Sequence, residues 1–389
     1  MRTELKLSLL AAAVALAACG KKEEAAAPAA STASTEALVV KIGHVGATSG
    51  GAAHLGKDNE NGARMAIADL NAKGIKIGGK TAKFELVAED DAADAKQGAA
   101  VAQRFCDMKV NSVVGHLNSG TTIPASKLYH ACGLPMITPA STNPDLTKPG
   151  YANVFRLIAS DSALGAGLAD FAAKQLKAKR VAIIDDRTAY GQGIATVFKN
   201  TAKQKGLQIV AEDFTNDKAV DFLAILTSIK AKKPDVIFFG GMDPQAGPML
   251  RQMTQLGMFN TKLMGGDGLC TEKLVDQAAK APTLANVYCG EGGSSITKTP
   301  NGKAWKARYD AKYPGEYQLY APYVYDATMV FADAMQRAGS ADPKVYLPFI
   351  GKTQYQGVTA KVAFDAKGEL QNPAMTIFSY PKMKKTPLN

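Results

Sequence analysis

The chain has 389 residues, of which 46% are hydrophobic, and a formal net charge of +11. This length predicts about two domains with ordinary hydrophobic cores. No apolar run beyond the N-terminal region approaches the roughly 18 residues that span a bilayer. The lysines are scattered over predicted helices and no basic block with interleaved aromatics occurs, so we expect a solvated basic surface and no nucleic-acid partner.

The N-terminal region has the pattern of a secretory signal. Basic residues precede the apolar run Leu7–Ala18, which is too short to span a bilayer, and small residues lead to Cys19. Cysteine directly after Leu-Ala-Ala resembles a bacterial lipobox, which predicts lipidation of Cys19; ordinary cleavage beside an incidental cysteine is the alternative. We therefore predict a signal peptide at 1–18, and the lipidated cysteine with a flexible tether at 19–37.

From residue 38 the sequence alternates between strands and helices, which is typical of a parallel sheet covered on both faces. The strands expected first are Leu38–His44, Lys83–Glu89, Ser112–Gly115, Pro135–Thr138 and Asn153–Leu157, with helices at Asn61–Ala72, Ala95–Lys109 and a segment that includes Lys127–Cys132.

The alternation starts again near Ser160, which predicts a second lobe of the same kind. Its expected strands are Arg180–Asp185, Gln208–Phe214, Val236–Gly240 and Leu263–Gly266, with helices at Ser162–Gln175, Gly191–Lys205, Asp221–Ala231 and Gln245–Leu256.

The last part of the chain fits a return to the first lobe followed by one more strand in the second. Two amphipathic helices, Ala304–Tyr309 and Tyr323–Ala338, precede short strands at Val362–Phe364 and Thr376–Tyr380. Several crossovers between similar lobes make a hinge with a cleft between the lobes. The predicted boundaries are 38–159 plus 293–362 for lobe one, and 160–292 plus 363–389 for lobe two.

Two hydroxyl-rich loops follow neighbouring strands of lobe one. Asn118–Thr122 opens a helix after one strand, and Thr138–Asn143 follows the next. A helix N-terminus attracts a carboxylate or phosphate, and the carboxyl ends of adjacent parallel strands meet in one crevice. The loops therefore predict an anion site, with ordinary caps and turns as the alternative.

The second lobe offers an aromatic ring and an acid at the matching edge. Tyr190 lies on the turn after one strand, and Asp267 is flanked by glycines after another. One carboxylate facing a cleft suits an ammonium group, although a turn aspartate is the alternative. Combined with the anion site, Asp267 predicts a clamp for a zwitterion.

Enzyme motifs are close to absent from the sequence. The segment Gly51–Asp58 nearly matches a nucleotide-binding loop, but Asp58 stands where the hydroxyl that holds Mg²⁺ is required. The four histidines are isolated, and near His116 we find no Cys or Asp that would complete a nucleophile-base pair. The acids Glu89–Asp91 and Asp94 precede a helix, where we expect them to cap rather than to bind metal.

Four cysteines remain after Cys19, an even number that suits disulfides in an oxidising compartment. Four cysteines allow three pairings. We predict Cys106–Cys132 and Cys270–Cys289, because each pair lies within one βα unit, with free buried thiols as the alternative. Neither pair has the C-x-x-C spacing of redox or zinc sites.

Five segments carry a resemblance to a known family. In chain order they are GHLNSGTTIPAS, MITPASTNPDLT, DDRTAYGQG, FFGGMDPQAG and MGGDG. They resemble the periplasmic leucine/isoleucine/valine-binding proteins of ABC transporters, and the resemblance extends from Leu38 to about Tyr380. It implies an α/β fold of two doubly wound parallel-sheet lobes joined by a three-strand hinge, the type I periplasmic-binding fold.

The resemblance also implies roles for residues of the two lobe-one loops. Ser119 and Thr142 would bind the α-carboxylate of an amino acid, with help from the backbone of Ala140 and Thr142. Leu117 and Asn118 would line the same pocket.

On the other side of the cleft, the resemblance implies that Tyr190 covers the ligand and that Asp267 binds its ammonium group. Three positions depart from the family pattern: Leu55 and Met242 stand where family members can carry aromatic residues, and Asn118 replaces a cysteine of some members. Leu55 and Met242 would still form an apolar wall, so we expect an aliphatic or larger apolar amino acid, with phenylalanine or a short amide as alternatives.

The function implied is that of an extracytoplasmic receptor rather than an enzyme. It would bind an apolar L-amino acid, close, and deliver the ligand to the permease of an ABC importer with its ATPase subunits. A ligand-sensing module for another amino acid or a short amide is the alternative. We expect a periplasmic, lipid-anchored monomer that uses no metal or other cofactor.

Overall fold

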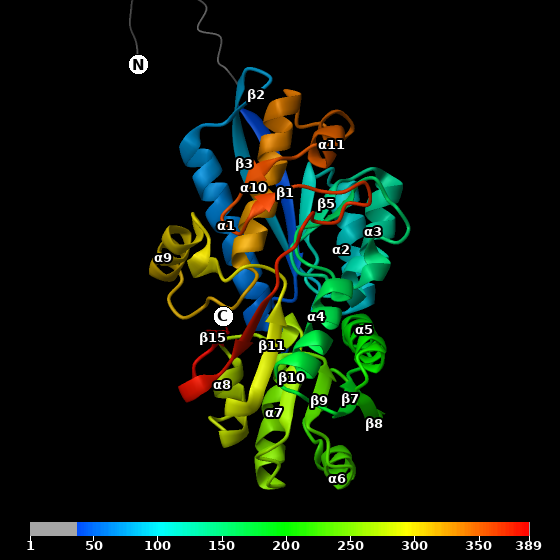
Figure 1. Ribbon diagram of the computed structural model, residues 1–389. Coiled ribbons are helices and arrows are strands. Elements are labelled where there is room, and N and C mark those ends of the chain that lie inside the picture. Colours follow the sequence, from blue (N-terminus) through cyan, green and yellow to red (C-terminus); the bar gives the residue numbers. More distant parts are fainter. Residues whose placement is uncertain (1–36, 389) are drawn as a thin grey trace, which may run out of the picture. The chain divides into compact units, whose positions relative to one another are not determined.

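The computed structural model describes residues 37–388 (Figure 1). The predicted signal peptide, Cys19 and nearly all of the tether lie outside these residues. The described chain forms two α/β lobes, each built on one large sheet. Over this part of the chain, no helix combines the length and the apolar character needed to cross a membrane.

The sheet of lobe one has the strand order β2-β3-β1-β4-β5-β6. Neighbours from β3 to β6 are parallel, and β2 adds a short antiparallel edge. Successive side chains point to opposite faces, so Val113 and Val114 enter different cores. The strands are β1 (Leu38–Gly46), β2 (Lys76–Ile77), β3 (Lys80–Asp90), β4 (Ser112–Gly115), β5 (Met136–Thr138) and β6 (Val154–Arg156).

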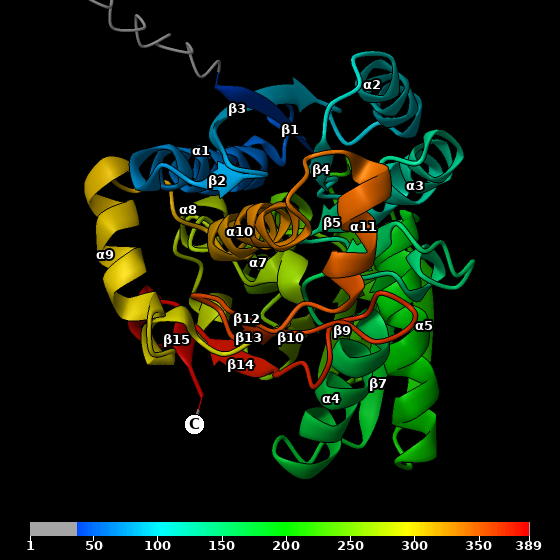
Figure 2. The same ribbon diagram turned by 90° about the horizontal axis from the view of Figure 1, so that it is seen from above.

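Helices cover both faces of this sheet. On one face α1 and α10 lie side by side, and on the other α2 packs against α3 (Figures 1 and 2). The α10 helix comes from the late part of the chain, so the chain returns to lobe one as predicted. The helices are α1 (Ala53–Lys73), α2 (Ala95–Asp107), α3 (Ser119–Cys132), α9 (Gly302–Lys312), α10 (Ala321–Ala338) and α11 (Pro343–Gly351).

The sheet of lobe two has the order β15-β14-β11-β10-β9-β7-β8. Strands from β8 to β11 are parallel, whereas β14 and β15 form an antiparallel edge, so the sheet is mixed. The strands are β7 (Arg180–Asp185), β8 (Gln208–Phe214), β9 (Val236–Gly240), β10 (Lys262–Gly265), β11 (Val287–Glu291), β14 (Thr376–Ser379) and β15 (Thr386–Pro387).

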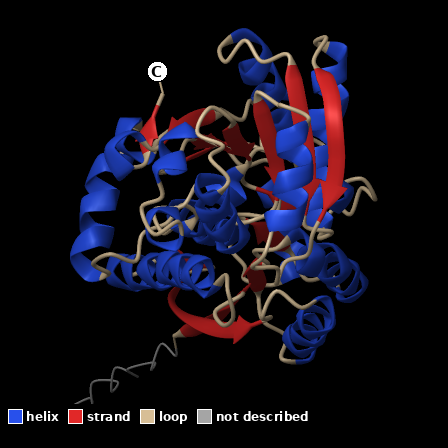
Figure 3. Ribbon diagram, turned by 90° about the horizontal axis from the view of Figure 1, so that it is seen from below, coloured by secondary structure: helices blue, strands red, loops and turns tan. Residues whose placement is uncertain are grey.

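Helices again flank the strands on both faces (Figure 3). One face packs against α4 and α5, and the other against α6, α7 and α8. These helices are α4 (Asp161–Lys174), α5 (Ala189–Gln204), α6 (Leu223–Ala231), α7 (Asp243–Gln255) and α8 (Leu274–Gln277).

The chain passes between the lobes three times: between β6 and α4, between β11 and α9, and between β13 and β14. The short hairpin of β12 (Tyr355–Gln356) and β13 (Lys361–Val362) precedes the third passage. The predicted fold class, two doubly wound lobes joined by a three-segment hinge, is confirmed.

One helix begins earlier than the sequence predicted: α1 starts at Ala53 instead of Asn61. The α3 helix starts at Ser119, within the segment Asn118–Thr122 that was predicted to open it. In α1 the glycine-rich start is helical because the helix lies directly on the end of β1: a Cβ on Gly56 would lie 1.9 Å from the carbonyl oxygen of Ala47. Strand β11 was missed, because its apolar pattern is interrupted by polar residues and glycine.

Candidate ligand-binding site between the lobes

A small cavity lies where the two lobes meet. Its volume is about 10 Å³, close to the space of one water molecule. An amino acid therefore enters only when the walls move apart, which a hinge between the lobes permits. The wall includes six residues predicted from the sequence, together with Tyr320: Leu117, Asn118, Ser119, Ala140, Tyr190 and Met242.

On the lobe-one side, Ser119 is the first residue of α3 and is almost fully buried. Its Oγ accepts hydrogen bonds from the Ser141 hydroxyl at 3.2 Å and from the Asn143 N–H at 3.4 Å. A hydroxyl that accepts twice keeps its own proton for a third partner. Because the first N–H groups of a helix lack intrahelical partners, this end of α3 supplies hydrogen-bond donors for a carboxylate.

A buried hydroxyl connects the two lobe-one loops. Thr138 Oγ1 donates to the backbone oxygen of His116 at 2.9 Å and accepts from the N–H of Ser141 at 2.9 Å. The neighbouring Thr142 is fully buried, and its side chain lies at the carboxylate of Asp161 rather than in the wall of the cavity.

His116 is not isolated, contrary to the prediction from the sequence. Its Nδ1 lies 2.7 Å from Asp91 Oδ2, and its Nε2 lies 3.0 Å from the hydroxyl of Tyr129. All three side chains are fully buried beneath the loop of Ser119. Asp91 lies 25 residues earlier in the chain, and the parallel pairing of β1 with β3 and β4 brings it here. This chain of buried contacts holds the loop in place.

On the lobe-two side, Asp267 is 1% exposed. The Tyr190 hydroxyl donates to its Oδ1 at 2.8 Å, and the Tyr320 hydroxyl donates to its Oδ2 at 3.0 Å. Burial raises the pKa of Asp267 to about 6, and the two tyrosine hydrogen bonds oppose this shift. Both tyrosines line the cavity, so the carboxylate lies directly behind its wall.

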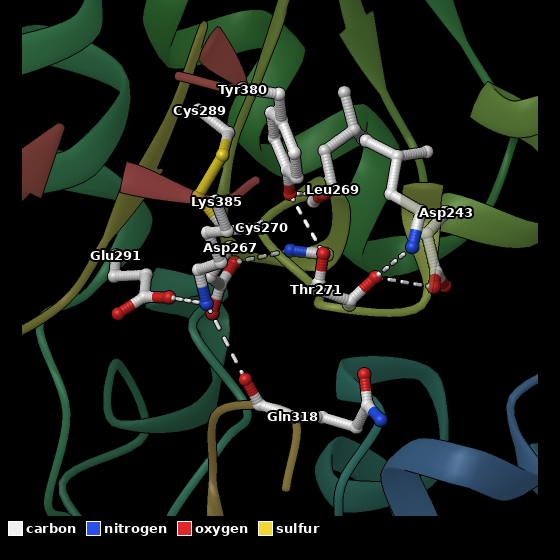
Figure 4. The surroundings of a disulfide bond; sticks show 12 residues. Asp243, Asp267, Leu269, Cys270, Thr271, Cys289, Glu291, Gln318, Tyr380 and Lys385 are labelled. Carbon is white, nitrogen blue, oxygen red and sulfur yellow. Dashed lines mark hydrogen bonds and ion pairs between the residues drawn. A yellow bond between two sulfur atoms is a disulfide. The ribbon is translucent and has the colours of Figure 1, made fainter. Parts of the chain in front are cut away.

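The loop that carries Asp267 is held firmly (Figure 4). Cys270 forms a disulfide with Cys289 on β11, and the hydroxyl of Tyr380 donates to the backbone oxygens of Leu269 and Thr271 at 3.1 and 2.9 Å. In lobe one, a second disulfide joins α2 to the end of α3. Both predicted disulfides, Cys106–Cys132 and Cys270–Cys289, are confirmed.

A second acid at this site was not predicted from the sequence. Asp161, at the start of α4, is fully buried beside the side chain of Thr142. Burial and the nearby Asp267 raise the pKa of Asp161 to about 8, and the side chain of Thr142 and the charge of Arg156 oppose this shift. Acids are common in first helical turns, so the sequence position carried no signal of this role.

Tyr320 was also missed, since nothing in the local pattern marks it. Its position depends on Asp58, whose buried carboxylate accepts the N–H of Tyr320 at 2.7 Å and of Ala321 at 3.0 Å. The N–H groups of Gln318 and Leu319 also donate to Asp58. Asp58 thus fixes the N-terminus of α10 and brings the ring of Tyr320 to Asp267.

The side-chain end of the site is less apolar than predicted. The amide nitrogen of Asn118 lies 3.6 Å from the sulfur of Met242 across the cleft. Leu55 is fully buried in the lobe-one core and does not line the cavity. One position before Leu55, His54 reaches Asp243 of lobe two at 2.7 Å. These contacts place the two lobes against one another at the cleft.

Of the acids near β3 that were predicted to cap the following helix, Asp94 does so: its Oδ1 accepts the N–H groups of Lys96 and Gln97 at 2.9 Å. For the other three acids the prediction is wrong, because Glu89 pairs with Arg104, Asp90 accepts the N–H groups of Thr48 and Ala92, and Asp91 contacts His116. Across residues 37–388, no cluster of three or more His, Cys, Asp or Glu side chains could hold a metal ion.

The fold and the cleft define the class of a two-lobed binding protein. The sequence model of the family described as periplasmic binding protein matches residues 39–384, so the chain belongs to this family. This agrees with the expectation of a binding protein rather than an enzyme.

Relatives and a solved structure support this membership. An amino acid binding protein of Pseudomonas aeruginosa is 35% identical over 89% of this chain and 92% of its own length. A leucine-, isoleucine-, valine-, threonine- and alanine-binding protein of the same organism is 32% identical, over 90% and 92%. A branched-chain amino acid transporter substrate binding protein of Streptococcus pneumoniae, solved with isoleucine, has a TM-score of 0.80 and 29% identity, and covers 89% of this chain and 97% of its own.

Proposed function

We propose that this protein binds an L-amino acid with an apolar side chain in the interlobe cleft and delivers it to the permease of an ABC importer. The observation that carries the proposal is the pairing of neutral donors on one wall with buried carboxylates on the other. The names of the relatives, which bind leucine, isoleucine or valine, support the same ligand class.

The carboxylate of the ligand would lie against lobe one. Ser119 has its hydroxyl proton free, Thr142 has a buried hydroxyl, and the backbone at Ala140 and Thr142 would add donors. A carboxylate needs several such donors when it is removed from water.

The ammonium group would lie against lobe two. Asp267 and Asp161 are both buried, and both raise the pKa of the neighbouring Tyr190. With a pKa of about 6, Asp267 is mainly ionised at neutral pH, whereas Asp161, with a pKa of about 8, would ionise when an ammonium group binds. An ammonium group between them would relieve the unfavourable burial of two acids. Tyr190 would cover the ligand, and the side chain would extend toward Leu117, Asn118 and Met242. Leu55 would support this apolar wall from the core.

The family implies how the binding protein is used. We propose export by the signal at 1–18 and anchoring through lipidated Cys19, with 19–37 as the tether to the membrane. We propose the lobe boundaries predicted from the sequence: 38–159 plus 293–362 for lobe one, and 160–292 plus 363–389 for lobe two. A monomer then docks onto the permease, whose ATPase subunits drive transport.

The proposal is tested with the mature protein and the twenty L-amino acids in a thermal-shift screen, followed by calorimetry. A ligand that binds the native state raises its apparent stability by mass action. We expect leucine, isoleucine or valine to bind, and small-angle scattering to show a smaller radius of gyration with ligand. The proposal is wrong if no amino acid binds, or if an analogue of leucine that lacks the ammonium group binds as tightly as leucine.

A further inference from the structure

We propose that the cleft contains a second subsite, which receives the cationic end of a long side chain, so that the protein binds arginine or lysine as well as apolar amino acids. The inference rests on the proposed function, because the head group of the ligand uses the same clamp.

The subsite is a chamber of about 300 Å³ next to the inner cavity. Both lobes contribute to its wall, from Ser49 and Ala93 on one side to Asp186 and Gln245 on the other. The chamber and the inner cavity share four wall residues: Asn118, Ser119, Tyr190 and Met242. The two spaces are therefore neighbours, separated by a single layer of side chains.

This layer can open. The contact that separates the two spaces is a weak hydrogen bond, in which the amide nitrogen of Asn118 lies 3.6 Å from the sulfur of Met242. Methionine is unbranched and flexible, so once the walls have moved apart to admit a ligand, a rotamer change at Met242 would join the two spaces. A short aliphatic side chain would then stay in the widened inner cavity, whereas a long one would pass into the chamber.

The chamber wall holds an acid whose hydrogen bonds are incomplete. Asp186 is 2% exposed, and its Oδ1 accepts both the N–H and the hydroxyl of Thr188, at 2.9 and 2.6 Å. Its Oδ2 is buried without a partner in the described part of the chain, and so is the Oδ1 of Asn118. Both atoms are acceptors, and a buried acceptor without a donor is unfavourable. Guanidinium and ammonium groups supply only donors, so they match this wall.

The charge of the wall points the same way. Asp217 lies beside Asp186, and Asp185 precedes it; both raise the pKa of Asp186, which burial brings to about 6, so the group is mainly ionised at neutral pH. Lys218 also lines the chamber, but it is exposed and can turn toward solvent. The buried charge on the wall is therefore negative, which selects a cation over a neutral amide.

Calorimetry on the mature protein with arginine, citrulline and leucine tests this inference. Citrulline has nearly the shape of arginine without its charge. We expect arginine to bind roughly ten- to a hundredfold more tightly than citrulline, the effect of one buried charge-assisted hydrogen bond. Equal affinities for arginine and citrulline, or leucine binding without arginine binding, would overturn the subsite and leave the proposed function intact. If none of the three binds, and no other amino acid does, the proposed function itself fails.

The variant Asp186→Asn sharpens the test. Its carbonyl oxygen can still accept the bonds from Thr188, while an NH₂ group replaces the free Oδ2. We expect the ratio of arginine to leucine affinity to fall about tenfold or more. The control is Asp221→Asn, an exposed residue at the start of α6 whose Oδ1 accepts the N–H of Leu223, a role that Asn can keep. An unchanged ratio in Asp186→Asn would contradict the subsite; if this variant does not fold, the arginine and citrulline comparison on the unaltered protein decides.

Discussion

The two walls of the cleft recognise charge by different means. Lobe one presents neutral donors that are held in place by internal hydrogen bonds, and the hydroxyls of Ser119 and Thr138 connect its two loops. Lobe two presents two buried carboxylates, Asp267 and Asp161, whose pKa values are raised because they lie away from water. The first wall is complete before a ligand arrives. The second wall holds one unfavourable buried charge, on Asp267, and one buried acid, Asp161, that would ionise when the ligand binds.

The walls are also braced differently. In lobe two a disulfide joins the Asp267 loop itself to β11, with Cys270 three residues after the acid. In lobe one the disulfide holds Cys132, at the far end of α3 from Ser119, and the loop is instead held by the buried contacts of His116. A wall that presents buried acids thus has a covalent brace next to them, and a wall of neutral donors relies on hydrogen bonds.

The largest expected effect is the loss of the acid in lobe two. Asp267→Asn keeps the shape but leaves the ligand ammonium without its charge partner, which we expect to weaken leucine binding by about 3–5 kcal/mol. Calorimetry measures the loss, and circular dichroism checks the fold. The exposed Asp276→Asn in the same lobe is the control and should bind as the unaltered protein does. Near-normal affinity in Asp267→Asn would show that the ammonium group lies elsewhere.

Removal of each disulfide in turn tests whether the two walls are stabilised differently. Replacing both cysteines of either pair by serine should lower the free energy of unfolding by about 3 kcal/mol, because each closes a loop of about 20 residues or more. Only the Cys270/Cys289 pair should also weaken leucine binding, since it holds the Asp267 loop. Denaturant unfolding and calorimetry on both double variants measure the two quantities. If the Cys106/Cys132 variant loses as much affinity, the proposed difference between the walls is wrong.

The sequence predicted the parts of this molecule that are local. Strands such as Arg180–Asp185 and Val236–Gly240 have apolar runs that define their ends, and these ranges agree with the structure. The return of the late helices to lobe one was predicted because they did not fit lobe two. By contrast, β11 depends on its pairing with β10 and β14, and the early start of α1 depends on the close approach of Gly56 to the chain at the end of β1.

The same division holds at the site. Ser119, Tyr190 and Asp267 lie in loops at strand ends, where residue types alone suggest ligand contact. Tyr320 depends on Asp58 across 262 residues. Asp161 occupies a usual place for a helix-starting acid, and only its burial distinguishes it. Long-range contacts of this kind cannot be derived from local patterns.

A smaller effect is expected at the neutral wall. Ser119→Ala removes one donor to the carboxylate and should weaken leucine binding by about 1–2 kcal/mol. The matched control is Ser126→Ala on the same helix, whose hydroxyl donates to the backbone oxygen of Ile123 at 2.8 Å. Affinity is measured by calorimetry for both. A larger loss for Ser126→Ala than for Ser119→Ala would show that helix stability, not a ligand contact, is being measured.

The pH dependence of binding gives the finest test of the charged wall. In the free protein burial raises the pKa of Asp161 to about 8, and a bound ammonium group should lower it again by favouring the ionised form. The free protein therefore holds more protons than the complex near neutral pH, so binding releases protons and strengthens as the pH rises. Between pH 7 and 8 we expect leucine affinity to increase about fivefold. This is the change expected when one group has a pKa of about 8 in the free protein and is ionised in the complex. Calorimetry in buffers of different ionisation enthalpy counts the protons released, and Asp161→Asn should lose the increase while Asp276→Asn keeps it. An affinity independent of pH in this range would mean that Asp161 does not face the ammonium group.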